Sequence, residues 1–136
     1  MPFDALEMSL TVMDTLVSVE TKLRARRKSL ADQVSRAAES VALNISEGRE
    51  RAGLDRADMF RRAAGSASEL TTGLRIARSR GYITHADYDT VDAALDRVRA
   101  MLWKLCRARH NFHYAESRIM PSPERSPTVR ELSDSA

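Results

Sequence analysis

Proline is absent between residues 3 and 120 of this 136-residue chain, and the four that occur are Pro2, Pro121, Pro123 and Pro127. A proline inside a helix costs about 3 kcal/mol, so the long proline-free interval is free to form long helices. Alanine, leucine, arginine, glutamate and serine are abundant in it, and this composition favours helix over sheet. The composition therefore predicts an all-α protein.

Cysteine and long apolar runs are scarce. The single cysteine, Cys106, excludes an internal disulfide, and its apolar surroundings favour a small core residue over a reactive thiol. No stretch approaches the roughly 20 apolar residues that a membrane span needs, and the N-terminus lacks the basic and apolar regions of a signal peptide. We expect one soluble, cytoplasmic domain with no membrane partner.

Motifs for catalysis and cofactor binding are also missing. The sequence has no Gly-rich phosphate loop, no Ser-His-Asp order and no Cys-His pair. The Glu-x-x-His motifs of di-iron bundles are absent, and His110 and His113 could share a helix face but have no visible third ligand. The sequence therefore predicts no enzyme, no cofactor and no metal site.

Apolar residues recur at spacings of three and four in four segments, which predicts four amphipathic helices. They are expected at about 4–23, 29–48, 55–80 and 84–109. Ser29 and Thr84 are the expected N-caps, each followed three residues later by an aspartate in the capping-box position. Gly48 and Gly81 are expected to end the second and third helices in the left-handed conformation.

Four such helices with short links predict an antiparallel up-down-up-down four-helix bundle over residues 1–114. Residues 115–136 contain Pro-Ser-Pro and Ser-Pro steps and little that could be buried, which predicts a disordered C-terminal tail. The first helix carries a second apolar stripe beside its core stripe. Such surplus apolar surface indicates self-association, and the stripe consists of Leu6, Leu10, Met13 and Val17.

Asn44 and Glu47 are the polar residues that most need explanation, because their spacing places them on one helix face. We favour a structural role, in which they brace the end of the second helix against the third, near Ser66 or Glu69. A contact with a ligand or nucleic acid is the alternative, and a catalytic role comes last.

Basic residues are concentrated at the expected helix ends. One group, at the first link, consists of Arg24, Arg26, Arg27 and Lys28, and the other, at the end of the third helix, of Arg75, Arg78 and Arg80. An antiparallel bundle would bring both groups to the same end. Contacts between such side chains and phosphates give salt-dependent, sequence-independent affinity for nucleic acid. With three Phe, three Tyr and one Trp, an extended stacking platform for single strands is not expected.

Several short motifs between about residues 28 and 108 resemble a bacterial four-helix-bundle family. They are Asn-Ile-Ser-Glu-Gly at 44–48, a phenylalanine at 60 followed by serine-x-x-glutamate-leucine at 66–70, and Gly-Tyr-Ile at 81–83. Members of that family include proteins encoded in intervening sequences of large-subunit ribosomal RNA genes. The resemblance implies an up-down protomer that assembles into a closed homopentameric ring, and it assigns Asn44, Glu47, Gly48, Glu69 and Gly81 to the structural motif.

The chain is more distantly similar to the accessory protein of diversity-generating retroelements, a basic pentameric barrel associated with a reverse transcriptase and nucleic acid. Together these features predict a non-enzymatic homo-oligomer that binds RNA or a nucleoprotein through its arginine clusters. The alternative is a protein-protein interaction scaffold whose arginines are helix-terminal salt bridges and solvated charge.

Overall fold

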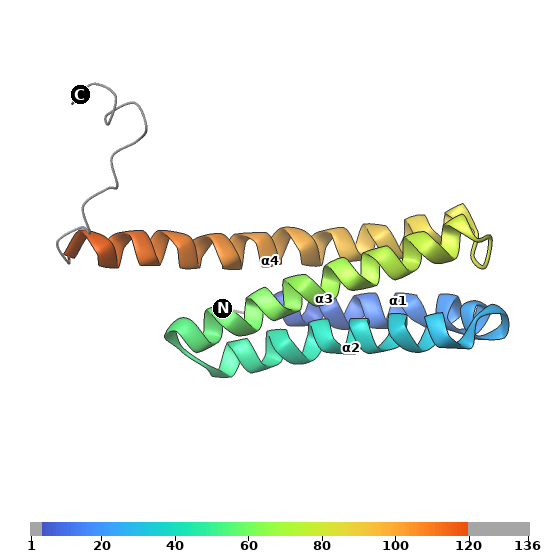
Figure 1. Ribbon diagram of the computed structural model, residues 1–136, viewed down its shortest axis with the longest axis horizontal. Coiled ribbons are helices and arrows are strands. Elements are labelled where there is room, and N and C mark those ends of the chain that lie inside the picture. The colour runs from blue at the N-terminus through green and yellow to red at the C-terminus, as the bar shows by residue number, and fades with distance from the viewer. Residues whose placement is uncertain (1–3, 120–136) are drawn as a thin grey trace, which may run out of the picture.

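The computed structural model describes the backbone of residues 4–119 and the side chains of residues 5–107. Its helices are α1 (Asp4–Arg26), α2 (Lys28–Glu50), α3 (Gly53–Ser79) and α4 (His85–Ile119), with no strand in this described range. The prediction of an all-α bundle of four helices is confirmed. Figure 1 shows the α1–α2 and α3–α4 links at one end of the bundle and the α2–α3 link at the other.

The helix α4 is longer than the sequence pattern predicts. It includes residues 115–119, which the sequence assigned to the tail. The rest of that expected tail, residues 120–136, lies outside the described residues. The boundary placed at residue 114 from the loss of apolar periodicity is therefore not an end of helical structure.

One continuous core holds the four helices together, with α2 and α4 each packed against both α1 and α3. The core stripes predicted from the sequence supply it. Burial of one such aliphatic side chain contributes about 1.5–3 kcal/mol. The largest fully buried side chains include Leu16, Leu23, Ile45, Leu70, Leu74, Leu95 and Leu102.

Glycine allows α2 and α3 to approach closely at two places. A Cβ atom on Gly48 would lie 2.7 Å from Cε1 of Phe60, and one on Gly73 would lie 2.9 Å from Cγ2 of Val34. Both separations are shorter than the contacts that close-packed side chains make. Phe60 and Val34 are both buried, so making room for a Cβ atom would require a buried side chain to shift.

The expectation that Gly48 ends α2 as a left-handed cap is wrong. The helix continues through Gly48 to Glu50 and is capped at Arg51, whose backbone N–H donates to the Gly48 carbonyl. The motif at 44–48 is therefore the last part of a helix and not a turn. Positive φ angles occur instead at Gly53 (63°) and Gly81 (73°).

The start of α2 also differs from the prediction. The link between α1 and α2 is the single residue Arg27, with φ −151° and ψ 87°, and α2 begins at Lys28 without a side-chain cap. Helical hydrogen bonds continue on both sides, since Arg27 N–H donates to the Leu23 carbonyl and Ala31 N–H donates to the Arg27 carbonyl. Ser29 is consequently inside the helix and cannot be its N-cap.

The α3–α4 link follows the predicted pattern. Gly81 N–H donates to the Arg78 carbonyl at 3.0 Å and Tyr82 N–H to the Ala77 carbonyl at 2.9 Å, which is the Schellman arrangement of a helix C-terminus. Two residues later, Thr84 N–H donates to Oδ2 of Asp87 and Asp87 N–H donates to Oγ1 of Thr84, both at 3.0 Å. This reciprocal pair is a capping box that starts α4.

The substitution Gly48→Ala is expected to lower the free energy of unfolding by about 1–3 kcal/mol, because the added methyl group must displace the buried ring of Phe60. Gly65→Ala is the matched control, since a Cβ atom there meets nothing within 4 Å. At that helical position alanine should raise the free energy of unfolding by about 0.5–1 kcal/mol. Urea denaturation measures the free energy of unfolding of both variants. Changes of the same sign in the two variants would contradict the close approach of α2 and α3 at Gly48.

The capping box makes stability depend on pH. The backbone hydrogen bond from Thr84, and then the hydrogen bond from Lys22, lower the pKa of Asp87 despite an opposing effect of burial. A depressed pKa in the folded state means that this stability is present above the ordinary carboxyl pKa of about 3.9 and is lost as the pH falls through the lower folded value. Asp87→Asn should therefore flatten the acid limb of a plot of unfolding free energy against pH.

Thr84→Ala provides the control for that experiment, because it removes the reciprocal hydroxyl and leaves the carboxylate. We expect it to cost about 1 kcal/mol at neutral pH. An acid limb that is unchanged in Asp87→Asn would show that Asp87 does not contribute to the pH dependence.

Candidate nucleic-acid interface

The α1–α2 and α3–α4 links bring the two predicted groups of basic residues to the same end of the bundle (Figure 1). We call this the basic end and define it by Arg24, Arg26, Arg27, Lys28, Arg75, Arg78 and Arg80. Lys22 ties α1 to the start of α4 there, with its Nζ 2.9 Å from Oδ1 of Asp87. The basic end is thus positioned by the two links and by a cross-helix ion pair.

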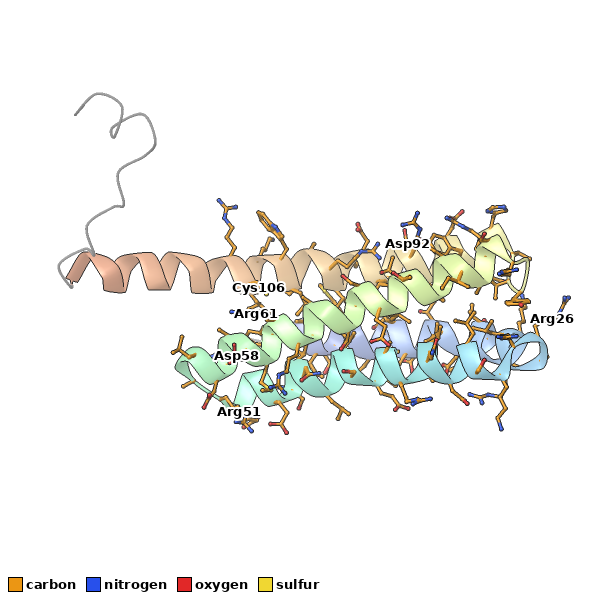
Figure 2. The ribbon with its side chains drawn as sticks, viewed as in Figure 1. Arg26, Arg51, Asp58, Arg61, Asp92 and Cys106 are labelled. Carbon is orange, nitrogen blue, oxygen red and sulfur yellow. The ribbon has the colours of Figure 1, made fainter. Side chains whose placement is uncertain are left out.

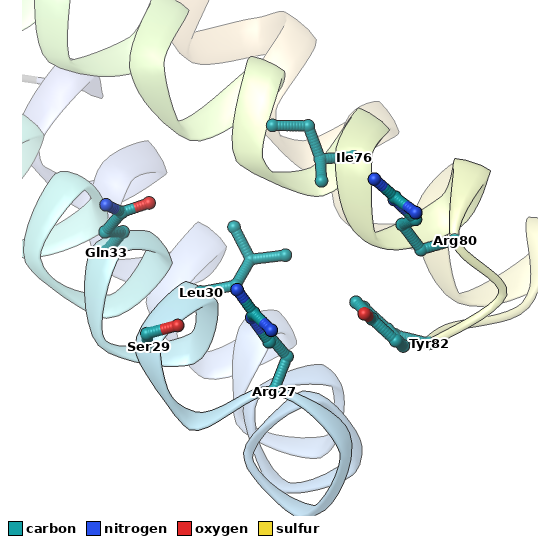
Figure 3. A pocket seen from close by; sticks show the side chains of 7 residues that line it. All are labelled: Arg27, Ser29, Leu30, Gln33, Ile76, Arg80 and Tyr82. Atoms are coloured by element: carbon teal, nitrogen blue, oxygen red, sulfur yellow. The ribbon is translucent and has the colours of Figure 1, made fainter.

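The basic residues do not form one cluster, because they project into different grooves. Arg27 and Arg80 face each other across a pocket of about 330 Å³ between α2 and α3, the α2–α3 pocket (Figure 3). Its α2 side also carries Ser29, Leu30 and Gln33, and its α3 side Ile76 and Tyr82.

Arg75 and Arg78 line a second groove, of about 530 Å³, between α3 and α4, together with Arg99. The guanidinium carbon of Arg78 lies 3.8 Å from the ring centre of Tyr88, a cation–π contact. Arg99 donates to Oδ1 of Asp92 at 2.7 Å and to Oγ1 of Thr71 at 3.0 Å. This α3–α4 groove therefore contains an acid, and two of its guanidinium groups are already engaged.

Arg99 was not among the predicted site residues, since it lies more than 20 residues from Arg78 in the sequence. Burial acts to lower its pKa, but the hydrogen bonds and charges of Asp92 and Asp96 together outweigh that effect and the pKa is raised. The charged form is thereby favoured. Only the packing of α4 on α3 brings Arg99 beside the other two arginines, so no local signal in the sequence could have identified it.

Arg24 is neutralised locally. Its Nη1 lies 2.8 Å from Oδ1 of Asp32, and this hydrogen bond is the main cause that lowers the pKa of Asp32. Asp32 was expected to cap α2 and instead binds a neighbouring helix. Arg24 is the one member of the predicted basic set that forms a salt bridge within the described residues, and the charge of Lys28 also lowers the pKa of Asp32.

The remaining positive charge of the basic end is open to solvent. Figure 2 shows Arg26 extending away from the helices at this end. Five of the seven predicted residues are exposed and form no ion pair within residues 5–107; they are Arg26, Arg27, Lys28, Arg75 and Arg80. This unpaired charge is the chemical property that distinguishes the basic end.

The predicted structural motif acts through a chain of hydrogen bonds between α2 and α3. Nδ2 of Asn44 donates to the Ser40 carbonyl at 2.8 Å and to Ser40 Oγ at 3.0 Å, and Ser40 Oγ lies 2.7 Å from Ser66 Oγ. Glu47 instead points to solvent and pairs with Arg51 one turn later, at 3.3 Å. Glu69 is exposed on α3. The two glutamates therefore form no paired carboxylate site.

Cys106 is partly buried and so is less enclosed than the sequence predicts. Burial raises the pKa of its thiol, against an opposing effect of Arg61, which lies beside it in Figure 2. The thiol is consequently protonated at neutral pH. In the described part of the chain no three His, Cys, Asp or Glu side chains form a metal-binding group, and no helix there is long and apolar enough to cross a membrane.

Comparison with known proteins identifies relatives of this fold. The profile of the 23S rRNA-intervening sequence protein family matches residues 3–104. The chain is similar to the 1.70 Å crystal structure of a protein with unknown function from the S23 ribosomal protein family of Bacteroides thetaiotaomicron, with 20% sequence identity and a TM-score of 0.69. That match covers 75% of this chain and 97% of the other, and it shows a shared fold. No curated protein matches the chain.

Asn44→Ala is expected to lower the free energy of unfolding by about 1 kcal/mol, because the half-buried serine pair loses a hydrogen-bond donor. Glu47→Ala is the matched control, and the loss of its exposed pair with Arg51 should cost at most about 0.5 kcal/mol. Urea denaturation measures both. A larger effect at Glu47 than at Asn44 would show that the motif braces the helices in another way.

Proposed function

The chain belongs to the 23S rRNA-intervening sequence protein family, and we propose that it is a non-enzymatic, cytoplasmic, homo-oligomeric bundle that binds RNA or a nucleoprotein through its basic end. In this proposal the protomer is an antiparallel up-down-up-down bundle, and protomers close into a pentameric ring. Membership of the family supports the fold. The nucleic-acid role is argued from the residues, because a fold does not determine a function.

The observation that carries the proposal is the unpaired charge of the basic end. Five exposed side chains there, on α1, the first link, α2 and the end of α3, form no salt bridge within the described residues. Charges left open in this way attract the regularly spaced phosphates of a nucleic acid, and binding releases the counterions condensed on it. The contacts would be to the phosphate backbone, which gives affinity without sequence preference.

The exposed side of α1 supports self-association. In the second apolar stripe, Leu10 is 42% exposed and Val17 is 60% exposed, while Leu6 and Met13 pack in part against the core. One bundle therefore leaves part of this stripe in water. In a closed ring each basic end would be repeated around the axis, and the summed field would attract a polyanion more strongly than one copy does.

The second candidate function is a protein-protein interaction scaffold. It is favoured by the arginines that are already engaged, Arg24 with Asp32 and Arg99 with Asp92, and by Trp103, which is 62% exposed on α4. Aromatic residues are enriched at interfaces between proteins. A nucleic-acid enzyme such as a reverse transcriptase would be a suitable partner in either case.

Fluorescence anisotropy with labelled RNA and DNA duplexes, over a salt series from about 50 to 200 mM, tests the proposal. We expect the logarithm of the binding constant to fall linearly with the logarithm of the salt concentration. Replacing Arg26, Arg27 and Arg75 together by glutamate should abolish it, whereas Arg62→Glu, an exposed position elsewhere on α3, should leave most of the affinity.

Circular dichroism would verify that the triple variant is folded. No binding to either duplex at about 50 mM salt would overturn the nucleic-acid role in favour of the scaffold, and a monomer in light scattering would remove the ring.

A further inference from the structure

We propose that the α2–α3 pocket binds a nucleoside monophosphate group, with the phosphate held by Arg27 and Arg80 and the base lying against Tyr82. Such a group occurs as a free nucleotide and as the 5′-phosphorylated end of an RNA strand. In the second case the inference rests on the proposed function and specifies which part of the RNA this pocket recognises.

The charge of the pocket matches a phosphate monoester. Arg27 comes from the α1–α2 link and Arg80 from the end of α3, and Figure 3 shows them on opposite sides of one space. None of the residues that line the pocket is acidic, and neither arginine forms an ion pair within residues 5–107. Two guanidinium groups suit a phosphate monoester, which carries nearly two negative charges at neutral pH.

Neutral hydrogen-bonding groups line the α2 side of the pocket, on the same side as Arg27 (Figure 3). The Ser29 hydroxyl and the Gln33 amide line the α2 side, and both are groups that can donate to phosphate or ribose oxygens. Ser29 belongs to the first turn of α2, which has no side-chain cap.

The rest of the lining is apolar and suits a planar base. Leu30 is buried and forms part of the floor, Ile76 is 45% exposed, and the ring of Tyr82 packs in part against the core. The backbone of Tyr82 is held by its hydrogen bond to the Ala77 carbonyl. An aromatic ring beside two phosphate-binding groups can take one base by stacking. The size of the pocket suits one small ligand better than a length of strand.

The α3–α4 groove is a weaker candidate for the same ligand although it is larger. Its Arg99 is bound to Asp92, and its Arg78 lies over Tyr88 at 3.8 Å. An incoming phosphate would have to compete with a carboxylate there. In the α2–α3 pocket neither guanidinium group has such a competitor.

Isothermal titration of the whole chain with AMP, adenosine and inorganic phosphate tests the pocket directly. We expect AMP to bind at least tenfold more tightly than either fragment. Arg27→Gln and Arg80→Gln should each weaken AMP binding about tenfold or more, as the loss of one charge-assisted contact predicts. Arg62→Gln is the matched control, because it removes an equal charge from an exposed position on α3 outside both the pocket and the basic end, and it should leave AMP binding unchanged.

Tyr82→Leu tests the contribution of the base to binding separately from that of the phosphate. It should weaken AMP binding and leave the weak binding of inorganic phosphate as it is. Because Tyr82 also packs on the core, thermal unfolding must show that this variant is folded. If Tyr82→Leu does not fold, Arg27→Gln and Arg80→Gln still test the proposal, because they change exposed residues.

Two RNA oligonucleotides of one sequence, one with a 5′-phosphate and one with a 5′-hydroxyl, distinguish the sources of the ligand. If the 5′-phosphate increases the affinity for RNA and Arg27→Gln removes this increase, the pocket binds RNA ends. If AMP binds and the 5′-phosphate does not increase the affinity for RNA, the pocket binds free nucleotides. Absence of both effects overturns the pocket, even if duplexes still bind in a salt-dependent way. Conversely, AMP binding with no RNA binding would overturn the proposed function and leave the pocket.

Discussion

The close approach of α2 and α3 is the constraint on which the rest of the structure depends. Gly48 faces Phe60 and Gly73 faces Val34 where a side chain would not fit, and between these two places Ser40 meets Ser66. Contacts of this kind hold only in one axial alignment, since a shift of either helix would bring a larger residue to a glycine position. The same alignment sets Arg27 across from Arg80, so the packing of the core determines which charges share a pocket.

The sequence predicted features that a single segment determines. The core stripes, the helical hydrogen bonds at Gly81 and the capping box at Thr84 depend on residues within a few positions of one another. Gly48 was misassigned because glycine serves two purposes, left-handed backbone and close packing, and only the partner helix distinguishes them. Ser29 was misassigned because the one-residue link puts Arg27 at the N-cap position and Ser29 inside the helix.

The sequence predicts that the basic residues lie at one end of the bundle. It does not predict how they divide between the α2–α3 pocket and the α3–α4 groove. Bringing both basic groups to one end needs only the direction of the helices. Their division follows from helical geometry: Arg75 and Arg78 lie three residues apart on one face, whereas Arg80 is two residues from Arg78 and about 200° around the axis. Which neighbour covers each face, and the ring of Tyr82 that completes the α2–α3 pocket, depend on packing that local patterns do not encode.

The single-residue link at Arg27 has a consequence for how the sequence can vary. A turn of this length contains no slack, so inserting or deleting one residue would rotate the preceding helix by about 100° about its axis. That rotation would separate Lys22 from Asp87 and Arg24 from Asp32 and turn buried leucines toward water. The number of residues in this link should therefore be as tightly constrained as any core side chain. Packing does not constrain which exposed residue occupies the link, so that residue can be selected for its chemical properties.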